Sequence, residues 1–352
     1  MGEAGVGVVV VAYDSAEVIV DCVRSLLASE GAPLRIVICD NASPDDTAAR
    51  LRRLAADTRT PLVELAEGGA LPEGRLPARG ITLLRLSVNG GFAAGANAGL
   101  RLLLAAPEVA LFWVLNPDCV VEPTTAAAYR RCAAAAGPFA LMGGRVVYMD
   151  PPHRIQTDGA RVSRWTGVVH SLNQGALPAD TPLPAAGALD LVSGANMVAS
   201  RRFLETCGLM EEGFFLYYEE VDWAFRRGAL PLVVCQQALV RHHGGTAIGS
   251  GTIARPPSGF ANYFNFRNRM RFVARRMPQA LPGAYLYSLA KVGQMLLRGG
   301  LGAATGAFFG LHQLPPPPAV RRRLSPQALA RATGRNSGRS DAPPDPDARR
   351  GS

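Results

Sequence analysis

The sequence predicts an α/β fold in which helices cover both faces of a mostly parallel sheet. Over the first 120 residues, short continuous apolar runs alternate with segments of helical periodicity. Runs of this kind are typical of strands that are buried on both faces. Polar residues follow directly after the runs. In an open α/β sheet this position lies at the carboxyl edge, where ligands bind.

The first half of the chain supplies most of the expected sheet. Strands are predicted at residues 5–13, 34–39, 81–87 and 110–116, which read GVGVVVVAY, LRIVIC, ITLLRLS and ALFWVLN. Helices are predicted at residues 18–27, 40–55 and 95–106, the first with an N-cap offered by Asp14 and Ser15. Strand–helix–strand alternation implies right-handed crossovers and parallel pairing. Residues 57–80 contain seven Gly or Pro residues and show little periodicity, so we expect a surface insertion there.

The second half is less regular. We expect strands and turns at 143–169, a loop at 175–188, a helix at 200–207, a strand ending in two histidines at 230–245, and helices at 280–312. A Pro/Arg-rich tail from 315 to 352 is predicted to be disordered, since it cannot bury enough apolar surface to fold.

The basic charge of the chain is concentrated at its end. The formal net charge is +9 over 352 residues, and the segment from Ala319 onward has eight Arg against three Asp. The rest of the chain therefore has a net charge of only +4 (9 − 5). This argues against a nucleic-acid groove, which concentrates basic charge on a structured face.

The six cysteines indicate a reducing compartment. They lie far apart in mostly apolar runs, with no C-x-x-C pair, as expected for buried thiols. No secretory signal is evident at the start of the sequence. Residues 280–312 are apolar but are interrupted by Lys291 and Arg298, which favours core or interfacial helices over a membrane span. We therefore expect a cytoplasmic protein.

Candidate ligand-binding residues follow the predicted strands. They are Ala12 and Tyr13 after the first, Asp40 and Asn41 after the second, and the Asn116-Pro117-Asp118 turn after the fourth. The glycine-rich NGGFAAGANAG, residues 89–99, does not fit G-x-G-x-x-G and follows the third strand, so a dinucleotide fold is disfavoured. Close approach of backbone to a ligand and tight helix packing both remain open for these glycines.

An acidic cluster among aromatic residues is the most unusual stretch. Residues 214–226 read FFLYYEEVDWAFR, which includes Glu219, Glu220 and Asp222. Burial of carboxylates is costly and raises their pKa. The cluster is therefore either a capped, solvated helix start, with Arg226 as a partner, or a site that needs a carboxylate for chemistry.

Taken in order, these motifs resemble the inverting nucleotide-sugar glycosyltransferases of family 2, the rhamnosyltransferase-like branch. The resemblance covers about residues 6–275 and rests on eight segments: VVVVAY, VICDNAS with DDT, NGGFAAGANAG, WVLNPDCVV, VSGANM, FFLYYEEVDWAFR, VRHHGGT and FRNRMRF. It implies a GT-A fold, with a domain over 1–255 whose nucleotide-sugar half ends near 120 and whose acceptor half covers 121–255. A helical segment over 256–314, with membrane association left open, and the disordered tail would follow.

The resemblance also implies roles for individual residues. Glu220 would be the catalytic base, at a position where relatives usually have aspartate, with Glu219 and Asp222 beside it. The nucleotide-sugar site would be formed by Ala12, Tyr13, Asp40, Asn41, Asn89, Gly91, Phe92, Asn97, Asn116 and Asp118. The acceptor side would include Gly194, Ala195, Trp223, Arg267 and Asn268.

A divalent metal, Mg²⁺ or Mn²⁺, is implied as well. Its ligands would be Asp118, the last acid of an NPD that stands where many relatives have D-x-D, and His242, with His243 as the fallback. The implied activity moves a sugar, rhamnose or another hexose, from a UDP- or dTDP-sugar to a polysaccharide or lipid-linked acceptor.

Two other questions stay open from the residues alone. The arginines at 267–276 lie among aromatics, which suits either an amphipathic helix with a solvated basic face or contact with an acceptor diphosphate or the anionic inner face of the cell membrane. Nucleic-acid binding has no other support. The alternative function is a nucleotide-sugar-binding relative that has lost turnover.

Overall fold

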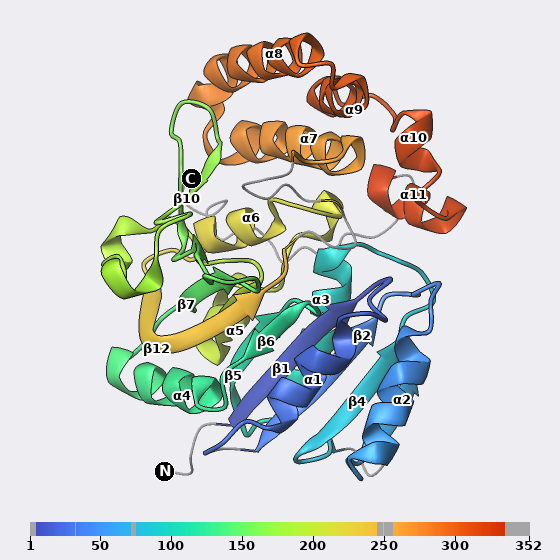
Figure 1. Cartoon of the computed structure of the whole chain (residues 1–352), viewed down its shortest axis with the longest axis vertical. Coiled ribbons are helices and arrows are strands. Elements are labelled where there is room, and N and C mark those ends of the chain that lie inside the picture. The colour runs from blue at the N-terminus through green and yellow to red at the C-terminus, as the bar shows by residue number, and fades with distance from the viewer. Residues whose placement is uncertain (1–4, 32, 72–74, 245–248, 250–255, 335–352) are drawn as a thin grey trace, which may run out of the picture.

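The computed structural model describes residues 5–31, 33–71, 75–244, 249 and 256–334. A ten-stranded sheet forms the centre of the molecule (Figure 1), with strand order β3-β4-β2-β1-β5-β11-β7-β12-β6 and β8 paired to β7. Its strands are β1 (Gly5–Ala12), β2 (Leu34–Asp40), β3 (Leu62–Ala66), β4 (Gly80–Arg85), β5 (Val109–Leu115), β6 (Cys119–Val121), β7 (Leu141–Tyr148), β8 (Ile155–Thr157), β11 (Asn196–Ser200) and β12 (Val233–His242). A separate hairpin pairs β9 (Ala160–Val162) with β10 (Val169–Ser171).

The N-terminal half of the sheet is parallel throughout. β1 pairs in parallel with β2 and β5, and β4 pairs in parallel with β2 and β3. Antiparallel pairing begins at β11, which lies between β5 and β7. The predicted mostly parallel α/β fold is therefore confirmed.

Helices cover both faces of this sheet, and the residues of β1 alternate between them. Val6, Val8 and Val10 belong to one core with α1 (Ile19–Leu27), α2 (Thr47–Asp57) and α4 (Thr125–Ala136). Val9 and Val11 belong to the other core, with α3 (Phe92–Leu104), α5 (Arg201–Cys207) and α6 (Glu219–Phe225). A strand with apolar side chains in both directions can only be satisfied by such a three-layer arrangement.

Two expectations about the first half were wrong. Residues 57–80 are not only a surface insertion, because they contain β3, which forms the edge of the sheet. The first helix begins at Ile19 with Val18 at its N-cap and no side-chain cap. Ser15 instead supplies its backbone carbonyl to the amides of Val18 and Ile19.

The glycines of the NGGFAAGANAG segment serve two purposes. A Cβ at Gly95 or Gly99 would collide with Val11 or Val9 of β1, so these two let α3 pack closely on the sheet. Gly91 has φ of +89°, and a Cβ there would overlap the backbone of Phe215. Tight helix packing is therefore confirmed for Gly95 and Gly99, and Gly91 lies close to the backbone of Phe215, whereas close approach to a ligand stays a prediction.

The C-terminal helices form a layer at the top of Figure 1. They are α7 (Gly259–Arg276), α8 (Leu281–Leu297) and α9 (Leu301–Leu311), followed by α10 (Pro318–Arg321) and α11 (Pro326–Thr333). α10 and α11 differ from the expected disordered tail, because Val320 and Ala332 are buried beside Phe215 and Phe264. The rest of the predicted tail lies outside the described residues. No helix among the described residues is long and apolar enough to cross a membrane.

The loop before α6 has a strained backbone. Phe215, Tyr217 and Tyr218 have φ of 66°, 66° and 73°, in the left-handed region that residues with bulky side chains rarely adopt. The Asn268 amide nitrogen lies 2.7, 2.7 and 3.0 Å from the carbonyl oxygens of Phe214, Leu216 and Tyr217. The Arg267 guanidinium donates to the Phe214 carbonyl at 2.8 Å. Strain of this kind persists only where the surroundings over-determine it.

Asn268→Ala should therefore destabilise the protein, because the Leu216 and Tyr217 carbonyl groups lose the Asn268 amide as a donor, while the Phe214 carbonyl keeps Arg267. An unsatisfied buried polar group costs about 1–3 kcal/mol, so we expect the free energy of unfolding in denaturant to fall by about 2 kcal/mol or more. The hydrogen bonds from Asn268 and Arg267 to this loop form a clamp. Asn265→Ala is the matched control, because Asn265 lies on the same helix, is partly exposed and is outside the clamp. Equal effects of the two substitutions would show that the clamp contributes nothing.

Candidate active site

A cavity of about 530 Å³ opens at the carboxyl edge of the sheet. Residues that follow β1, β2, β4 and β5 meet there with the loop before α6, residues 214–218, which we call the aromatic loop. The ends of β6 and β12 complete the cavity. Twelve of the predicted residues line it: Tyr13, Asn41, Asn89, Gly91, Phe92, Asn116, Asp118, Gly194, Ala195, Glu219, Glu220 and His242. A cavity of this size suits a small-molecule ligand.

Asn41 and Asn89 shape one wall of this cavity. The Asn41 amide nitrogen donates to the Gly91 carbonyl at 2.9 Å, and its oxygen accepts from the Gly90 amide at 3.1 Å. The Asn89 side-chain oxygen accepts from the Gly91 amide at 2.9 Å. The Phe92 amide in turn donates to the Phe215 carbonyl at 2.8 Å. The two asparagines thus fix the glycine turn against the aromatic loop.

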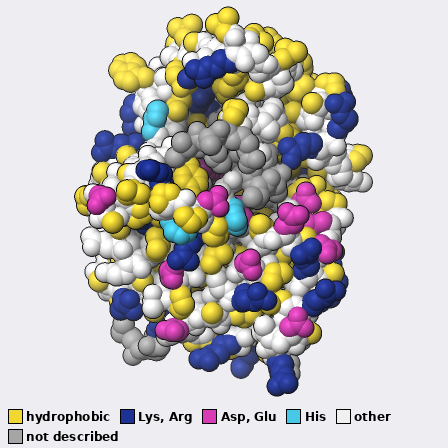
Figure 2. All heavy atoms as spheres, viewed as in Figure 1, with side chains coloured by type: hydrophobic (Ala, Val, Ile, Leu, Met, Phe, Trp, Pro, Cys, Tyr) yellow, Lys and Arg dark blue, Asp and Glu magenta, His cyan; other side chains and the backbone are white. Residues whose placement is uncertain are grey.

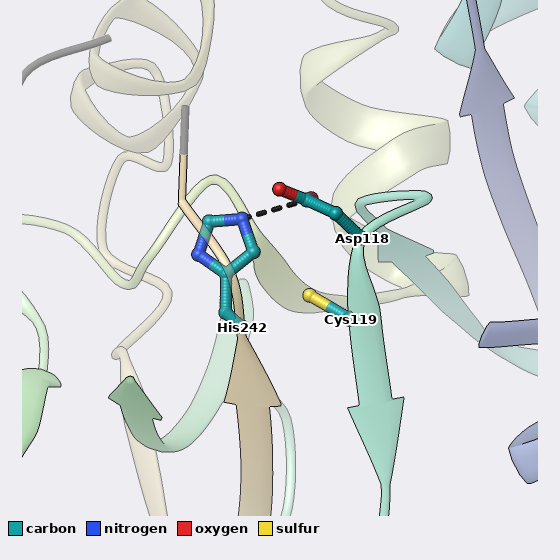
Figure 3. A group of neighbouring side chains, drawn as sticks. All are labelled: Asp118, Cys119 and His242. Atoms are coloured by element: carbon teal, nitrogen blue, oxygen red, sulfur yellow. Dashed lines mark ion pairs between the residues drawn. The ribbon is translucent and has the colours of Figure 1, made fainter. Parts of the chain in front are cut away.

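Asp118 and His242 face one another across the cavity wall (Figure 3). Asp118 precedes β6, and His242 is the last residue of β12. The His242 Nε2 atom lies 3.0 Å from the Asp118 carboxylate, and both side chains are buried. His243, the fallback ligand, is exposed and instead donates its backbone amide to the Asp118 carbonyl. The structure therefore pairs Asp118 with His242.

The donor set of this pair fits a divalent cation. His242 Nδ1 lies 2.7 Å from the Gln156 side-chain oxygen, a contact that suits the tautomer protonated at Nδ1, with Nδ1–H as the donor. The other nitrogen, Nε2, then points its lone pair at a carboxylate unless a proton or a cation lies between them. One oxygen and one imidazole nitrogen are ligands that Mg²⁺ and Mn²⁺ accept.

Electrostatics favour the ionised carboxylate at Asp118. Burial acts to raise its pKa, but the neighbouring His242 and the backbone amides outweigh this and lower the pKa below its ordinary value. Cys119 lies in the same group, and burial together with the Asp118 charge raises the pKa of its thiol. A thiol held in its neutral form is a poor metal ligand. It donates instead to the Ala195 carbonyl at 3.5 Å.

Glu219, which is buried, and Glu220, which is half-buried, lie at the first turn of α6. Burial raises the pKa of Glu219 well above its ordinary value, and the charge of Glu220 adds to the effect. One Glu219 oxygen has no hydrogen-bond partner among the described residues. Burial also raises the pKa of Glu220, although backbone amides at the helix start partly oppose it. The solvated-helix interpretation is therefore wrong for Glu219.

Asp222 and Trp223 belong to the protein interior. The Asp222 carboxylate lies 2.9 Å from Arg226 and 2.8 Å from Arg276, which form ion pairs with it. Trp223 is fully buried and donates its indole N–H to the Gly208 carbonyl. Neither residue lines the cavity, so the structure does not place them with Glu219 and Glu220.

Five further predicted residues also lie outside the cavity lining: Ala12, Asp40, Asn97, Arg267 and Asn268. The Asp40 carboxylate lies 2.7 Å from Arg85 Nε and accepts from the Ser43 amide. Asn97 exchanges two hydrogen bonds with the backbone of Met210. Arg267 and Asn268 clamp the aromatic loop. Each of these polar side chains positions backbone or another side chain.

Several lining residues were missed from the sequence. Asp14 and Ser15 follow β1 and line the cavity; Asp14 also lies in the predicted position after the first strand, whereas Ser15 was predicted only as part of a helix cap. Gln156 comes from β8, and Arg323 and Leu324 come from the C-terminal segment. These three could be placed only by long-range packing, which leaves no local pattern in the sequence.

The buried Glu219 predicts a pH-dependent effect of Glu219→Gln on stability. A raised pKa in the folded state favours the protonated carboxyl, so this stabilising contribution is complete below about pH 4.3, the ordinary pKa of glutamate. It is lost as the pH rises through the folded-state pKa. Because Gln cannot ionise, the variant should gain free energy of unfolding relative to the parent between pH 4 and pH 8. Glu205→Gln, an exposed acid on α5, should show a flat difference; a flat difference for Glu219→Gln would contradict the account.

Comparison with known proteins agrees with this geometry. Residues 7–155 match the family model described as Glycosyl transferase family 2. No curated protein matches the sequence significantly.

Solved structures are similar over most of the chain. The S. aureus TarS fragment 1–349 has a TM-score of 0.50 at 12% identity, covering 94% of this chain and 88% of that chain. The same fragment in complex with UDP-GlcNAc has a TM-score of 0.52 at 12% identity, with the same coverage. GalNAc-T7 with UDP, GalNAc and Mn²⁺ has a TM-score of 0.54 at 13% identity, covering 88% of this chain and 56% of that chain.

At these identities the likeness shows the fold. Residues 7–155 thus match the Glycosyl transferase family 2 model, and the chain has the GT-A fold of these solved structures.

Proposed function

We propose that this protein is an inverting glycosyltransferase that transfers a sugar from a nucleoside diphosphate to an acceptor hydroxyl. One observation carries the proposal: the same cavity is lined by a half-buried carboxyl group, Glu220, and by the Asp118–His242 pair. The first is a base for the acceptor, and the second is a site for a cation near the departing diphosphate. Their convergence at the carboxyl edge suits an α/β nucleotide-binding sheet.

Glu220 is proposed as the general base. The acceptor oxygen forms a bond to the anomeric carbon while the bond to the diphosphate oxygen breaks, and the diphosphate leaves with the electron pair. The hydroxyl proton passes to the Glu220 carboxylate. Burial that raises the pKa of this group brings it closer to the working pH, which makes it a better base. Attack opposite the leaving group inverts the anomeric configuration.

Asp118 and His242 are proposed as protein ligands of Mg²⁺ or Mn²⁺. Gln156 holds the His242 ring in the tautomer whose free nitrogen faces Asp118. When bound, the ion would neutralise charge on the diphosphate. The Mn²⁺ in the GalNAc-T7 structure supports this use of the fold. Tyr13, Asn41 and the glycine turn after Asn89 are proposed to hold the nucleotide, as a UDP- or dTDP-sugar, consistent with UDP and UDP-GlcNAc in the neighbours' structures.

The proposed donor sugar is rhamnose or another hexose, and the proposed acceptor is a polysaccharide or a lipid-linked glycan of cell-wall or polysaccharide biosynthesis. The domain limits proposed are 1–255 for the transferase and 256–314 for the helical segment, to which the described part of the tail, with α10 and α11, is now added. Arg323 of that part lines the cavity and adds a positive charge to it.

The helical segment is proposed to touch an anionic membrane surface from the cytoplasmic side. Hydrophobic side chains gather on the helices at the top of Figure 2, with Lys and Arg side chains between them. Leu286, Leu297 and Leu301 have exposed fractions of 65%, 90% and 69%. Apolar groups beside basic ones are typical of interfacial helices.

Glu220→Gln tests the proposed base. The variant should lose about 10²–10⁴-fold in turnover, the usual contribution of general base catalysis, while its affinity for the donor stays within about twofold. Turnover is measured as nucleoside diphosphate release with acceptor present, and affinity by calorimetry. Glu205→Gln serves as the control because it lies on the exposed face of α5. Retained turnover in Glu220→Gln would exclude the role. A parent protein that binds donors without turning them over would favour the binding-only alternative.

Leu297→Ser tests the membrane contact. Removing the most exposed leucine of this surface should weaken co-sedimentation with vesicles that contain phosphatidylglycerol, because apolar area buried in the interface is lost. Leu177→Ser, an exposed leucine distant in the chain from α8, should leave sedimentation unchanged. If the parent protein does not sediment with these vesicles, the membrane contact is wrong.

A further inference from the structure

A second cavity, of about 310 Å³, lies next to the candidate donor cavity. Tyr217 and Glu220 line both cavities, so the proposed base stands between them. The other walls of the second cavity come from α7, α8 and the β10 strand of the small hairpin. Neither helix lies in the segment that matches the family model. A molecule in this cavity would therefore contact Glu220.

The walls of the second cavity combine positive charge with aromatic rings. Arg269 has an exposed fraction of 4%, and its guanidinium lies over the rings of Phe266 and Tyr287, at 4.5 and 5.5 Å from their centroids. Lys291, the single lysine of the sequence, places its ammonium 5.6 Å from the Tyr287 centroid. Aromatic faces beside cations suit a sugar that carries an anionic group.

The charge of Arg269 is not balanced within the described part of the chain. Its hydrogen-bond partner there is the Ser288 hydroxyl, at 2.6 Å, and no carboxylate forms an ion pair with it. Its Nε atom is buried without a hydrogen-bond partner in the same set of residues. By contrast, buried Asp222 has two arginine partners. A buried cation without a counter-ion is costly unless a ligand supplies the negative charge.

We propose that this second cavity binds an anionic acceptor, with its phosphate or carboxylate group at Arg269 and Lys291 and its reactive hydroxyl at Glu220. The statement that the bound molecule is the sugar acceptor rests on the proposed function. The anion site itself does not depend on that function. Helix α8 carries both Lys291 at the cavity and the exposed Leu286 and Leu297. The lipid-linked diphosphate of a membrane-borne glycan is therefore one source of the anion, and a phosphate or carboxylate on a soluble glycan is the other.

The unique lysine permits a direct test that does not need turnover. The full chain is treated with an amine-selective acetylating reagent in EDTA, and labelling of Lys291 and of the terminal α-amino group is followed by mass spectrometry. Inorganic phosphate and a phytyl-diphosphate-linked N-acetylglucosamine should each slow Lys291 labelling, by tenfold or more at saturation. The terminal amine, labelled in the same molecule, should be unaffected, and the uncharged octyl glucoside should protect neither amine.

The results distinguish the two sources of the anion, and they test the anion site separately from the proposed function. Protection at a concentration at least tenfold lower for the lipid diphosphate than for inorganic phosphate assigns the lipid-linked acceptor, and equal potency assigns a small anionic group. Arg269→Gln should abolish protection, whereas Arg298→Gln, on the exposed end of α8, should retain it. Equal slowing of both amines, or equal protection by octyl glucoside, would overturn the proposal in the parent protein even if Arg269→Gln fails to fold. Protection of Lys291 in a protein that transfers no sugar would leave the anion site standing and reject only the proposed function.

Discussion

The clamp on the aromatic loop is the constraint on which the site depends. Three residues with strained backbone, Phe215, Tyr217 and Tyr218, lead into α6 and place Glu219 and Glu220 at the cavity. The strain is held by buried Asn268 and Arg267 of α7, which satisfy the carbonyl groups that the loop leaves unpaired. The C-terminal helices are thus part of the candidate active site, because the strained loop depends on the hydrogen-bond donors of α7 to hold this conformation.

Buried charged groups differ in whether they have a partner of opposite charge. Carboxyl groups that are needed only for structure, such as Asp222 and Asp158, have arginine partners close by. Glu219 and Glu220 have none among the described residues, and burial raises the pKa of each. The guanidinium of Arg269 likewise lacks a counter-charge in that part of the chain. Two carboxyl groups with a raised pKa and a guanidinium without a counter-charge therefore lie around the two adjoining cavities, as expected for functional sites.

Much of the fold could be predicted from local pattern. β1 is apolar in both directions, and this alone requires helices on both faces of the sheet. The position of Tyr13, Asn41 and Asn116 at strand ends was sufficient to bring them to one edge. The pairing of Asp118 with His242 came from the resemblance, since 124 positions separate them and no periodicity links them.

The rest depended on packing that the sequence does not display. Asp40 and Asn97 were predicted to bind the nucleotide sugar. In the structure Asp40 forms an ion pair with Arg85, and Asn97 forms a hydrogen bond with the backbone of Met210. The tail looked disordered by composition, yet Val320 and Ala332 are buried against the aromatic loop because that loop leaves an apolar surface exposed. A few apolar residues in the tail do not predict burial from the sequence unless the surface on which they pack is known.

The most direct test of the central claim is nucleoside diphosphate release from a panel of UDP-, dTDP- and GDP-sugars, with a lipid-linked glycan present and with Mn²⁺ or Mg²⁺ compared with EDTA. The account predicts metal-dependent release from one UDP- or dTDP-sugar, and loss of that release in Asp118→Asn. Release that is unchanged by EDTA and by Asp118→Asn, or absence of release from every donor, would contradict it.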